Sequence, residues 1–334
     1  MLNGHGDDIY ACTQPIVSNF SSNVYGKQDL SALEAHLCSR MAIIHSYPEP
    51  DARSLTEQLA LFHGIQAENT GVVNGATEAV YLIAQTFGGS RSAIVTPTFS
   101  EYADACTLHG HTVSFCSNLE EMDEQAQLVW LCNPNNPNGK VYDTEYLCEI
   151  IAQNTDKLFV IDQSYEYFTH EPVYQPADAI EYKNVILLHS MTKKYAIPGL
   201  RLGYFTAHTD WVRAISKHRM PWSVNALAVE AGKFLLTQSP GNLDIDGYLK
   251  ESVRLQNTLK QIAGLTVFPS KTHFFLCRLC NKTAFELKQW LIENHGILIR
   301  DASNFRGLDD RFFRIATQSP DENDALVKAI SEWI

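Results

Sequence analysis

Several common features are scarce or missing in this 334-residue sequence. No apolar run approaches the ~20 residues that cross a membrane, and the first eight residues lack the charged and then apolar pattern of a signal peptide. Basic residues are outnumbered, 26 to 38, which gives a formal net charge of -12 and disfavours binding to nucleic acid or to an anionic membrane. We therefore expect a cytoplasmic protein in which any anionic ligand meets a local basic pocket.

Two further kinds of site lack the residues they need. The eight cysteines are scattered, which fits reduced thiols better than a disulfide framework. Cys277 and Cys280 form a single C-x-x-C, and His109 and His111 flank a glycine, but neither pair has the additional ligands of a metal site. No G-x-G-x-x-G follows an apolar run, which disfavours a dinucleotide-binding dehydrogenase. We expect no metal.

Short apolar runs alternate with helical patterns through the middle of the chain. The strand-like runs are residues 93–96, 112–115, 128–132, 158–161, 185–188 and 202–206. This alternation is typical of an α/β fold with a mostly parallel sheet covered by helices. The length leaves room for a smaller α/β domain. We expect an N-terminal arm and part of the small domain in 1–45, a large domain in 46–244, and a small C-terminal domain in 245–334.

One stretch, residues 190–203, joins several reactive side chains after an apolar run. Ser190 comes first, Lys193 follows, and a Pro-Gly turn returns the chain to Arg201. An amine is a potential nucleophile, and a guanidinium can clamp a phosphate. Taken alone, the stretch is equally consistent with surface lysines in a loop.

Other candidate site residues also follow apolar runs or interrupt them. Gly75 and Ala76 precede an amphipathic helix, whose first free N–H groups favour an anion. Asp162 and Tyr165 end another run, and Arg314 stands inside the apolar run 312–316. An unpaired guanidinium in such a strand would be costly unless an anion meets it.

In this order, the motifs resemble those of the fold-type I pyridoxal-phosphate enzymes, specifically the class I/II aminotransferase group. The most specific part is Ser-x-Thr-Lys-x-x-Ala-Ile-x-Gly-Leu-Arg-Leu-Gly at 190–203. One departure is Asn-Pro-Asn-Gly at 136–139, where the family usually has Asn-Pro-Thr-Gly. The resemblance covers nearly the whole chain and implies pyridoxal 5'-phosphate, bound by the domain at 46–244, and a homodimer with shared active sites.

The resemblance also implies roles for individual residues. Lys193 would carry the cofactor as a Schiff base and shuttle protons, Asp162 would pair with the ring nitrogen, and Tyr165 would contact the ring's phenolic oxygen. The remaining cofactor-binding residues would be Gly75, Ala76, Thr77, Phe99, Asn136, Ser190, Arg201 and Tyr47. Tyr47 corresponds to a tyrosine that reaches the partner subunit's cofactor.

Two groups within the family resemble this chain: the histidinol-phosphate aminotransferases and the L-threonine-O-3-phosphate decarboxylases of cobalamin biosynthesis. Both use phosphorylated substrates, so Arg300 would bind a substrate phosphate and Arg314 a carboxylate. His5 and Asn23, in the arm, would also contact substrate. The arm departs from the family, because Ser-Asn-Val-Tyr-Gly at 22–26 replaces an expected Asn-Pro-Leu-Gly.

Longer stretches at 193–203, 220–225 and 299–309 are nearer to the decarboxylases. We therefore expect decarboxylation of threonine phosphate to (R)-1-aminopropan-2-yl phosphate. The alternative is a histidinol-phosphate or related aminotransferase that uses 2-oxoglutarate. A non-catalytic ligand sensor with this fold is more remote, since the chain is acidic and only about 30 irregular residues precede the fold.

Overall fold

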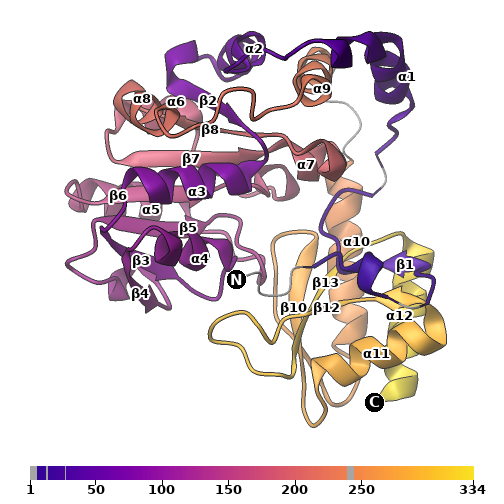
Figure 1. Cartoon of the computed structure of the whole chain (residues 1–334). Helices are drawn as coiled ribbons and strands as arrows, with labels where there is room; N and C mark the ends of the chain where they lie inside the picture. The colour runs from indigo at the N-terminus through magenta and orange to yellow at the C-terminus, as the bar shows by residue number, and fades with distance from the viewer. Residues whose placement is uncertain (1–5, 13, 27, 239–243) are drawn as a thin grey trace.

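Two sheets of different size organise the chain, as Figure 1 shows. The computed structural model describes residues 6–12, 14–26, 28–238 and 244–334. The large sheet contains β2 (Thr70–Val73), β3 (Arg91–Val95), β4 (Thr112–Cys116), β5 (Leu128–Cys132), β6 (Leu158–Asp162), β7 (Val185–Ser190) and β8 (Gly203–Ala207). Its order is β2-β8-β7-β6-β5-β3-β4, and only β8 runs antiparallel to its neighbours. The predicted mostly parallel α/β sheet is confirmed.

Helices cover both faces of the large sheet, which explains why its central strands are apolar on both sides. On one face, α3 (Ala76–Thr86), α4 (Glu101–Leu108) and α8 (Thr209–Ser216) share a core with Trp130 and Val160. On the other face, α5 (Thr144–Gln153) and α6 (Pro176–Glu181) share a core with Phe159 and Ile161. Neighbouring residues of one strand thus enter opposite cores.

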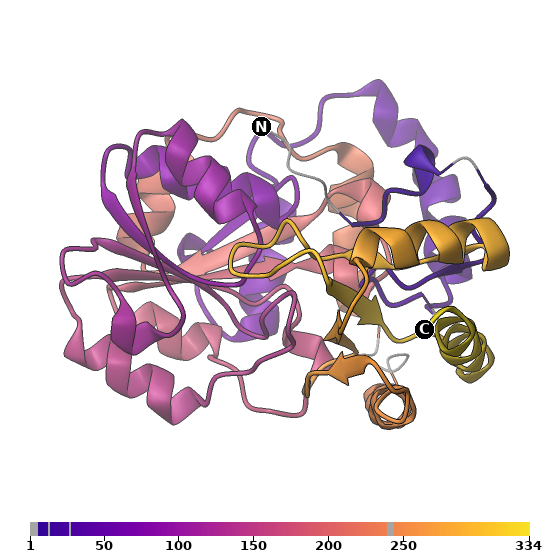
Figure 2. The ribbon, with the colours of Figure 1, turned by 90° about the horizontal axis from the view of Figure 1, so that it is seen from below.

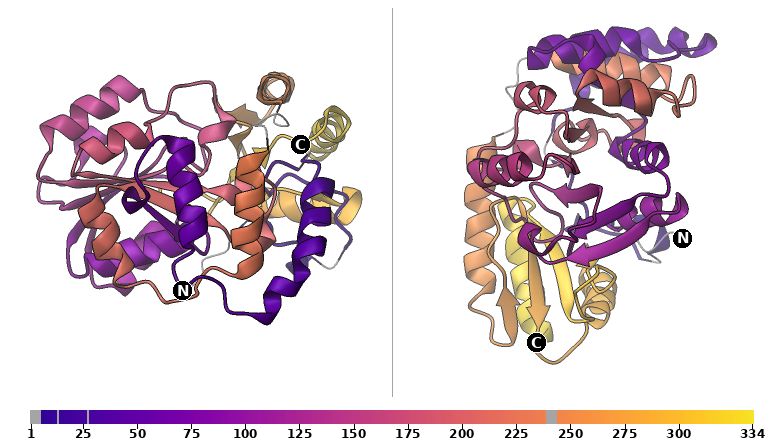
Figure 3. Two further views of the ribbon diagram at one scale, coloured as in Figure 1. Left: turned by 90° about the horizontal axis from the view of Figure 1, so that it is seen from above. Right: turned by 90° about the vertical axis from the view of Figure 1, so that its left-hand side faces the viewer.

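A third layer of helices lies beyond β2 and β8. It consists of α1 (Ser31–Arg40), α2 (Arg53–His63) and α9 (Ala226–Thr237), which pack together in Figure 3. The sequence pattern suggests Ser54 as the N-cap of α2, but the N-cap is Ala52, in the left-handed region at φ 54°. The Ser54 N–H lies inside the helix and donates to Glu49 Oε2. Gly64 ends α2 at φ 68°.

The small sheet is antiparallel and lies beside the large one (Figure 2). Its strands are β12 (Arg300–Asp301), β13 (Phe312–Ala316), β10 (Phe274–Leu279) and β9 (Leu265–Val267), in that order. The helices α10 (Ile245–Leu259), α11 (Ala284–His295) and α12 (Pro320–Trp333) share its core. In the arm, β1 (Ser18–Asn19) pairs in parallel with β11 (Ile297–Leu298), so Phe20 enters the same core.

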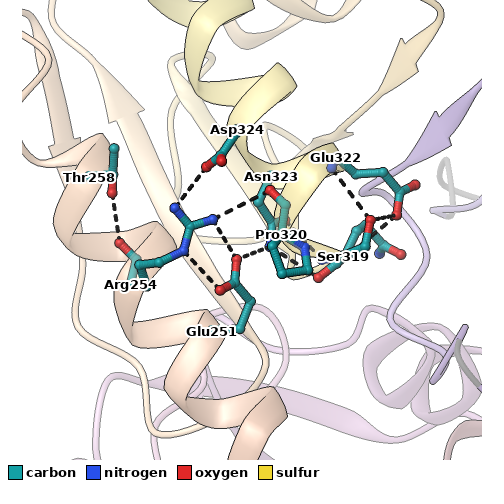
Figure 4. Close-up of polar contacts among 9 residues, drawn as sticks. Glu251, Arg254, Thr258, Ser319, Pro320, Glu322, Asn323 and Asp324 are labelled. Carbon is teal, nitrogen blue, oxygen red and sulfur yellow. Dashed lines mark hydrogen bonds and ion pairs between the residues drawn. The ribbon is translucent and has the colours of Figure 1, made fainter.

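Polar contacts join α10 to the start of α12, as Figure 4 shows. Arg254 donates to Glu251 and to Asp324, each at 2.7 Å. Ser319 and Glu322 form a capping box that opens α12. Exposed pairs of this kind stabilise a fold by no more than about 1 kcal/mol each, so the shared apolar core holds these helices together.

Short 3₁₀ helices complete the described elements: Ile9–Ala11, Met41–His45, Ala67–Asn69, Leu119–Glu121, Glu166–Phe168 and Pro198–Leu200. Within the described residues, no helix combines the length and the apolar character needed to cross a membrane.

Candidate functional site

Strand ends of the large sheet enclose an inner cavity of about 110 Å³. The cavity is lined by nine of the predicted cofactor residues, namely Ala76, Thr77, Phe99, Asn136, Asp162, Tyr165, Ser190, Lys193 and Arg201. These residues come together because the carboxyl ends of parallel strands meet at one edge of a sheet. The cavity is therefore built from segments that each follow or approach a strand end.

An outer cavity of about 350 Å³ adjoins the inner one. It also contacts Lys193, and it is lined by Asn23 from the arm, Arg300 from β12 and Arg314 from β13. Three of the four predicted substrate residues thus face the same space as the predicted catalytic lysine. His5, the fourth, lies outside the described residues.

The junction between β2 and α3 forms a close-fitting cradle around Arg201. Gly75 has φ 81°, and a Cβ at this position would lie 2.6 Å from Arg201 Nη2. Only glycine accommodates both the left-handed backbone and this approach. Because α3 begins at Ala76, its first N–H groups have no partner within the helix and can bind an anion.

Two hydroxyl groups extend this donor set. Ser190, the last residue of β7, and Thr192, in α7 (Met191–Lys194), lie with their oxygens 2.7 Å apart. Thr192 was not among the predicted site residues, although it is the threonine of the Ser-x-Thr-Lys pattern quoted above. A guanidinium, helix N–H groups and two hydroxyls together have the chemistry of a phosphate site.

Asp162, at the end of β6, is held by three hydrogen bonds and is only 5% exposed. Its Oδ2 accepts from the Tyr102 hydroxyl at 2.6 Å. Its Oδ1 accepts from the Ser164 N–H at 2.8 Å and from the Ser164 hydroxyl at 2.6 Å. Burial, with the nearby Asp162 carboxylate, raises the pKa of Tyr102 well above its usual value, so Tyr102 remains a donor. The carboxylate is fixed where a cationic ring nitrogen could meet it.

From the sequence alone, Tyr102 is as consistent with core packing as with the lining of a pocket. The structure gives it both places: it lines the inner cavity and its ring stacks on Trp130. Phe99, also in the cavity wall, meets the Tyr102 ring edge-on at 5.8 Å. The aromatic wall of the inner cavity therefore rests on the core of the large sheet.

Lys193 is enclosed between the two cavities. Burial lowers the pKa of Lys193 to about 8, and repulsion from the Arg314 and Arg201 cations acts in the same direction. Near this pH a large fraction of the amine is neutral and can act as a nucleophile or a base. The amine donates to Asn23 Oδ1 at 3.1 Å.

Asn23 also contacts Tyr165, so it joins two residues of the inner cavity. Its Nδ2 donates to the Tyr165 hydroxyl at 2.5 Å. Its backbone carbonyl lies 3.1 Å from His273 Nε2. Burial raises the pKa of Tyr165 above its usual value, although the Arg314 cation opposes this. The arm thus supplies a side chain that contacts both Lys193 and Tyr165.

Arg314 is 3% exposed within β13. Its Nη1 donates to Asn136 Oδ1 and its Nη2 to the Ser21 carbonyl, both at 2.5 Å. Its Nε has no hydrogen-bond partner among the described residues. Burial lowers the pKa of Arg314 to about 10, which still leaves a cation at neutral pH. A buried cation with an unused donor favours the arrival of an anion.

Arg300 lies across the outer cavity and is held by its own strand and the following loop. Its Nη1 donates to the Asp301 carbonyl at 2.7 Å and its Nη2 to Asn304 Oδ1 at 2.8 Å. The Phe305 ring centroid lies 5.4 Å from its Cζ. Burial lowers the pKa of Arg300 from its usual value. The outer cavity therefore contains two fixed guanidinium groups.

Comparison with known proteins identifies the family. The model of the aminotransferase class I and II family matches residues 15–330. The chain belongs to this family. This match confirms the prediction that the chain belongs to the class I/II aminotransferase family of enzymes, which implies pyridoxal phosphate.

Both groups predicted from the sequence occur among relatives of this aminotransferase-family chain. Threonine-phosphate decarboxylase of Salmonella typhimurium is 32% identical over 330 residues, which cover 93% of this chain and 90% of that protein. Histidinol-phosphate aminotransferase of Thermoanaerobacter pseudethanolicus is 32% identical over 307 residues, covering 87% and 85%. The crystal structure of L-threonine-O-3-phosphate decarboxylase from Porphyromonas gingivalis has a TM-score of 0.93 at 42% identity, covering 95% of this chain and 99% of that one.

Tyr47 lines neither cavity of this family member. It is 84% exposed, and its ring packs on Trp222 at 5.2 Å. The structure therefore does not place Tyr47 at the predicted cofactor site of its own chain. The expectation from the family is a contact with the cofactor of a second subunit.

Proposed function

We propose that this chain binds pyridoxal 5'-phosphate in the inner cavity and decarboxylates L-threonine-O-3-phosphate to (R)-1-aminopropan-2-yl phosphate, a step of cobalamin biosynthesis. The bound cofactor would supply a ring that accepts the electron pair of the breaking bond. The residues that would hold it are Gly75, Ala76, Thr77, Ser190, Thr192 and Arg201 at the phosphate, Asp162 at the ring nitrogen, Asn136 and Tyr165 at the phenolic oxygen, and Phe99 at the ring face. The cradle at Gly75 and the buried Asp162 carboxylate support this assignment.

The observation that carries the proposal is the pair of arginines that face Lys193 in the outer cavity. Threonine phosphate has two anionic groups, a carboxylate and a phosphate. Arg314 would bind the carboxylate, and Arg300 would bind the phosphate. Guanidinium groups suit both anions because their planar donors match two oxygens at once.

The chain's own residues would then control protons and orientation. The neutral Lys193 amine would be available as a nucleophile when the cofactor binds, and it would later move protons at the substrate's α-carbon. When the carboxylate leaves as CO₂, the electron pair of the broken C–C bond remains at that carbon. A proton from Lys193 would then bind this electron pair and take the place of the carboxylate. Asn23 would hold the lysine near this position through its 3.1 Å contact.

The second candidate is a histidinol-phosphate aminotransferase, which the equal 32% identity to that group favours. Histidinol phosphate has a phosphate but no carboxylate, so it would use one arginine, whereas 2-oxoglutarate would offer carboxylates to both. The two reactions differ in which substrate bond is held perpendicular to the cofactor ring. That orientation depends on the bound substrate.

The test uses purified protein loaded with pyridoxal phosphate. With threonine phosphate we expect CO₂ release and an equal amount of aminopropanol phosphate, measured by gas analysis and mass spectrometry. Lys193→Ala should abolish both, while Lys328→Ala, a change at an 80% exposed lysine, should alter neither. Amino transfer from histidinol phosphate to 2-oxoglutarate without CO₂ release would establish the alternative instead.

We also propose a homodimer in which the exposed Tyr47 reaches the partner's cofactor. Tyr47→Ala and Lys193→Ala should each lower activity when pure. If the partner supplies Tyr47, a mixed dimer of these two variants has one site with both residues intact, so mixing under exchange conditions should restore activity. No gain on mixing, together with a monomer by light scattering, would reject the shared site.

A further inference from the structure

The loop between β12 and β13 holds Arg300 and then reaches the large sheet. Asn304 accepts a hydrogen bond from Arg300, and Phe305 packs beside its guanidinium. Phe305 is buried with Leu276 in a small apolar cluster under the loop. In Figures 1 and 2 this loop extends from the small sheet toward the large one. Local packing of Asn304 and Phe305 thus holds the Arg300 side chain in place.

Arg306, the next residue, meets the edge strand of the large sheet. Its Cζ lies 3.8 Å from the ring centroid of Phe115, which is a cation–π geometry. Phe115 is on β4, at the end of the large sheet's strand order. Its side chain is 38% exposed, so it contributes less to the core than its buried neighbours. The contact joins the large sheet to the loop whose preceding residues, Asn304 and Phe305, line the outer cavity beside Arg300.

We infer that the Arg306–Phe115 contact is a specificity-determining brace that fixes the distance between Arg300 and Lys193. Asn304 and Phe305 hold Arg300, whereas Lys193 follows a strand of the large sheet. Arg306 follows directly after those two residues and contacts β4. This contact therefore holds Arg300 at a fixed position relative to the large sheet. Arg306 and Phe115 are positioning residues, since neither lines the outer cavity.

The identity of the substrate in this inference rests on the proposed function. The distance from the amine to the phosphate of an amino-acid phosphate depends on its chain length. Threonine phosphate and serine phosphate have the same backbone, while homoserine phosphate is one methylene longer. A fixed distance should therefore disfavour homoserine phosphate, and a relaxed distance should tolerate it better.

The experiment compares Phe115→Leu, Arg306→Gln and the double variant with the wild type. Each single change should raise KM for threonine phosphate roughly two- to fivefold, the effect of an exposed cation–π contact, with kcat and cofactor affinity little changed. The preference for threonine phosphate over homoserine phosphate should fall by a similar factor. The double variant should resemble the singles, because both remove one contact.

Two conservative variants and one matched control sharpen the result. Phe115→Tyr keeps the ring and Arg306→Lys keeps the cation, so both should retain most of the wild-type KM. Phe285→Leu changes a phenylalanine on α11 that is 58% exposed, and it should have no effect on KM.

Hydrogen–deuterium exchange of the amides at 303–308 tests the contact without any substrate. We expect faster exchange in Phe115→Leu and Arg306→Gln than in the wild type and in Phe285→Leu. Unchanged exchange would overturn the brace whatever the enzyme's substrate. Faster exchange with unchanged KM and chain-length preference would overturn its role in specificity. Absence of threonine phosphate turnover in the wild type would instead reject the proposed function, and the KM comparison would then use the phosphorylated substrate that the wild type accepts.

Discussion

The inner and outer cavities share Thr77, Phe99, Asn136, Tyr165 and Lys193, yet they are built in different ways. The inner cavity is formed within residues 76–201, close to strand ends of one sheet. The outer cavity adds residues from the arm, β12 and β13, which reach it only when the small sheet and the arm pack against the large sheet. Substitutions on the two sides should therefore separate cofactor binding from substrate binding.

The largest effect is expected at Lys193, where the two cavities meet. Lys193→Ala removes the amine that would act as nucleophile and proton carrier, so turnover should fall on the order of 10³-fold or more. The visible absorbance of bound cofactor should also change to that of free pyridoxal phosphate. Retention of substantial turnover by a correctly folded Lys193→Ala protein would refute the assigned role.

Arg314→Gln should separate the two sides of the site. Loss of the buried cation leaves a substrate carboxylate without its partner, which should raise KM on the order of 10²-fold. Cofactor absorbance should persist, because the phosphate cradle at Gly75 and Arg201 is unchanged. Arg254→Gln, which changes a surface arginine in a different cluster, serves as the control. An equal loss of cofactor affinity in Arg314→Gln would show that the two sides are not separable.

Asn23→Ala tests the link from the arm to the catalytic region. It removes contacts to Lys193 and Tyr165, and hydrogen bonds to charged groups contribute enough that kcat/KM should fall about tenfold. Asn294→Ala, at a surface amide that donates to the Trp290 carbonyl of its own helix, should leave kcat/KM unchanged. If Asn23→Ala had the same kcat/KM as the control, the arm would only cover the site and its contacts to Lys193 and Tyr165 would not contribute to turnover.

The smallest effect concerns pH and shows how the outer cavity influences the inner one. Since the pKa of Lys193 is lowered to about 8, the neutral amine is scarce below this pH and becomes abundant above it. The rate at which cofactor-free protein takes up pyridoxal phosphate should rise as pH increases through about 8 and level off above it, where most of the amine is neutral. Arg314→Gln removes a repelling cation, so its profile should move to higher pH. Stopped-flow absorbance would measure both profiles, and identical midpoints would contradict the coupling.

The inner cavity was largely predictable because its residues lie in short, ordered motifs. Lys193, Asp162 and Gly75 each lie beside an apolar run, and the direction of parallel strands brings such positions together. Thr192 lies in the same motif and could have been included. Ser54 shows the limit of local rules: a serine before apolar residues suggested an N-cap, but the hydrogen bond from its N–H to Glu49 and the conformation of Ala52 place the helix start two residues earlier.

The sequence by itself determined the alternation of strands and helices, the family and the residues around Lys193, because these depend on periodicity and short-range motifs. Only the tertiary structure decided that Asn23 bridges Lys193 and Tyr165, that Arg314 is held by Asn136 and Ser21, and that Arg306 meets Phe115. Most of these partners lie far apart along the chain and share no motif. Their contacts arise from how the arm and the small sheet pack against the large sheet, and that packing is a collective result of buried surface and not of any local pattern.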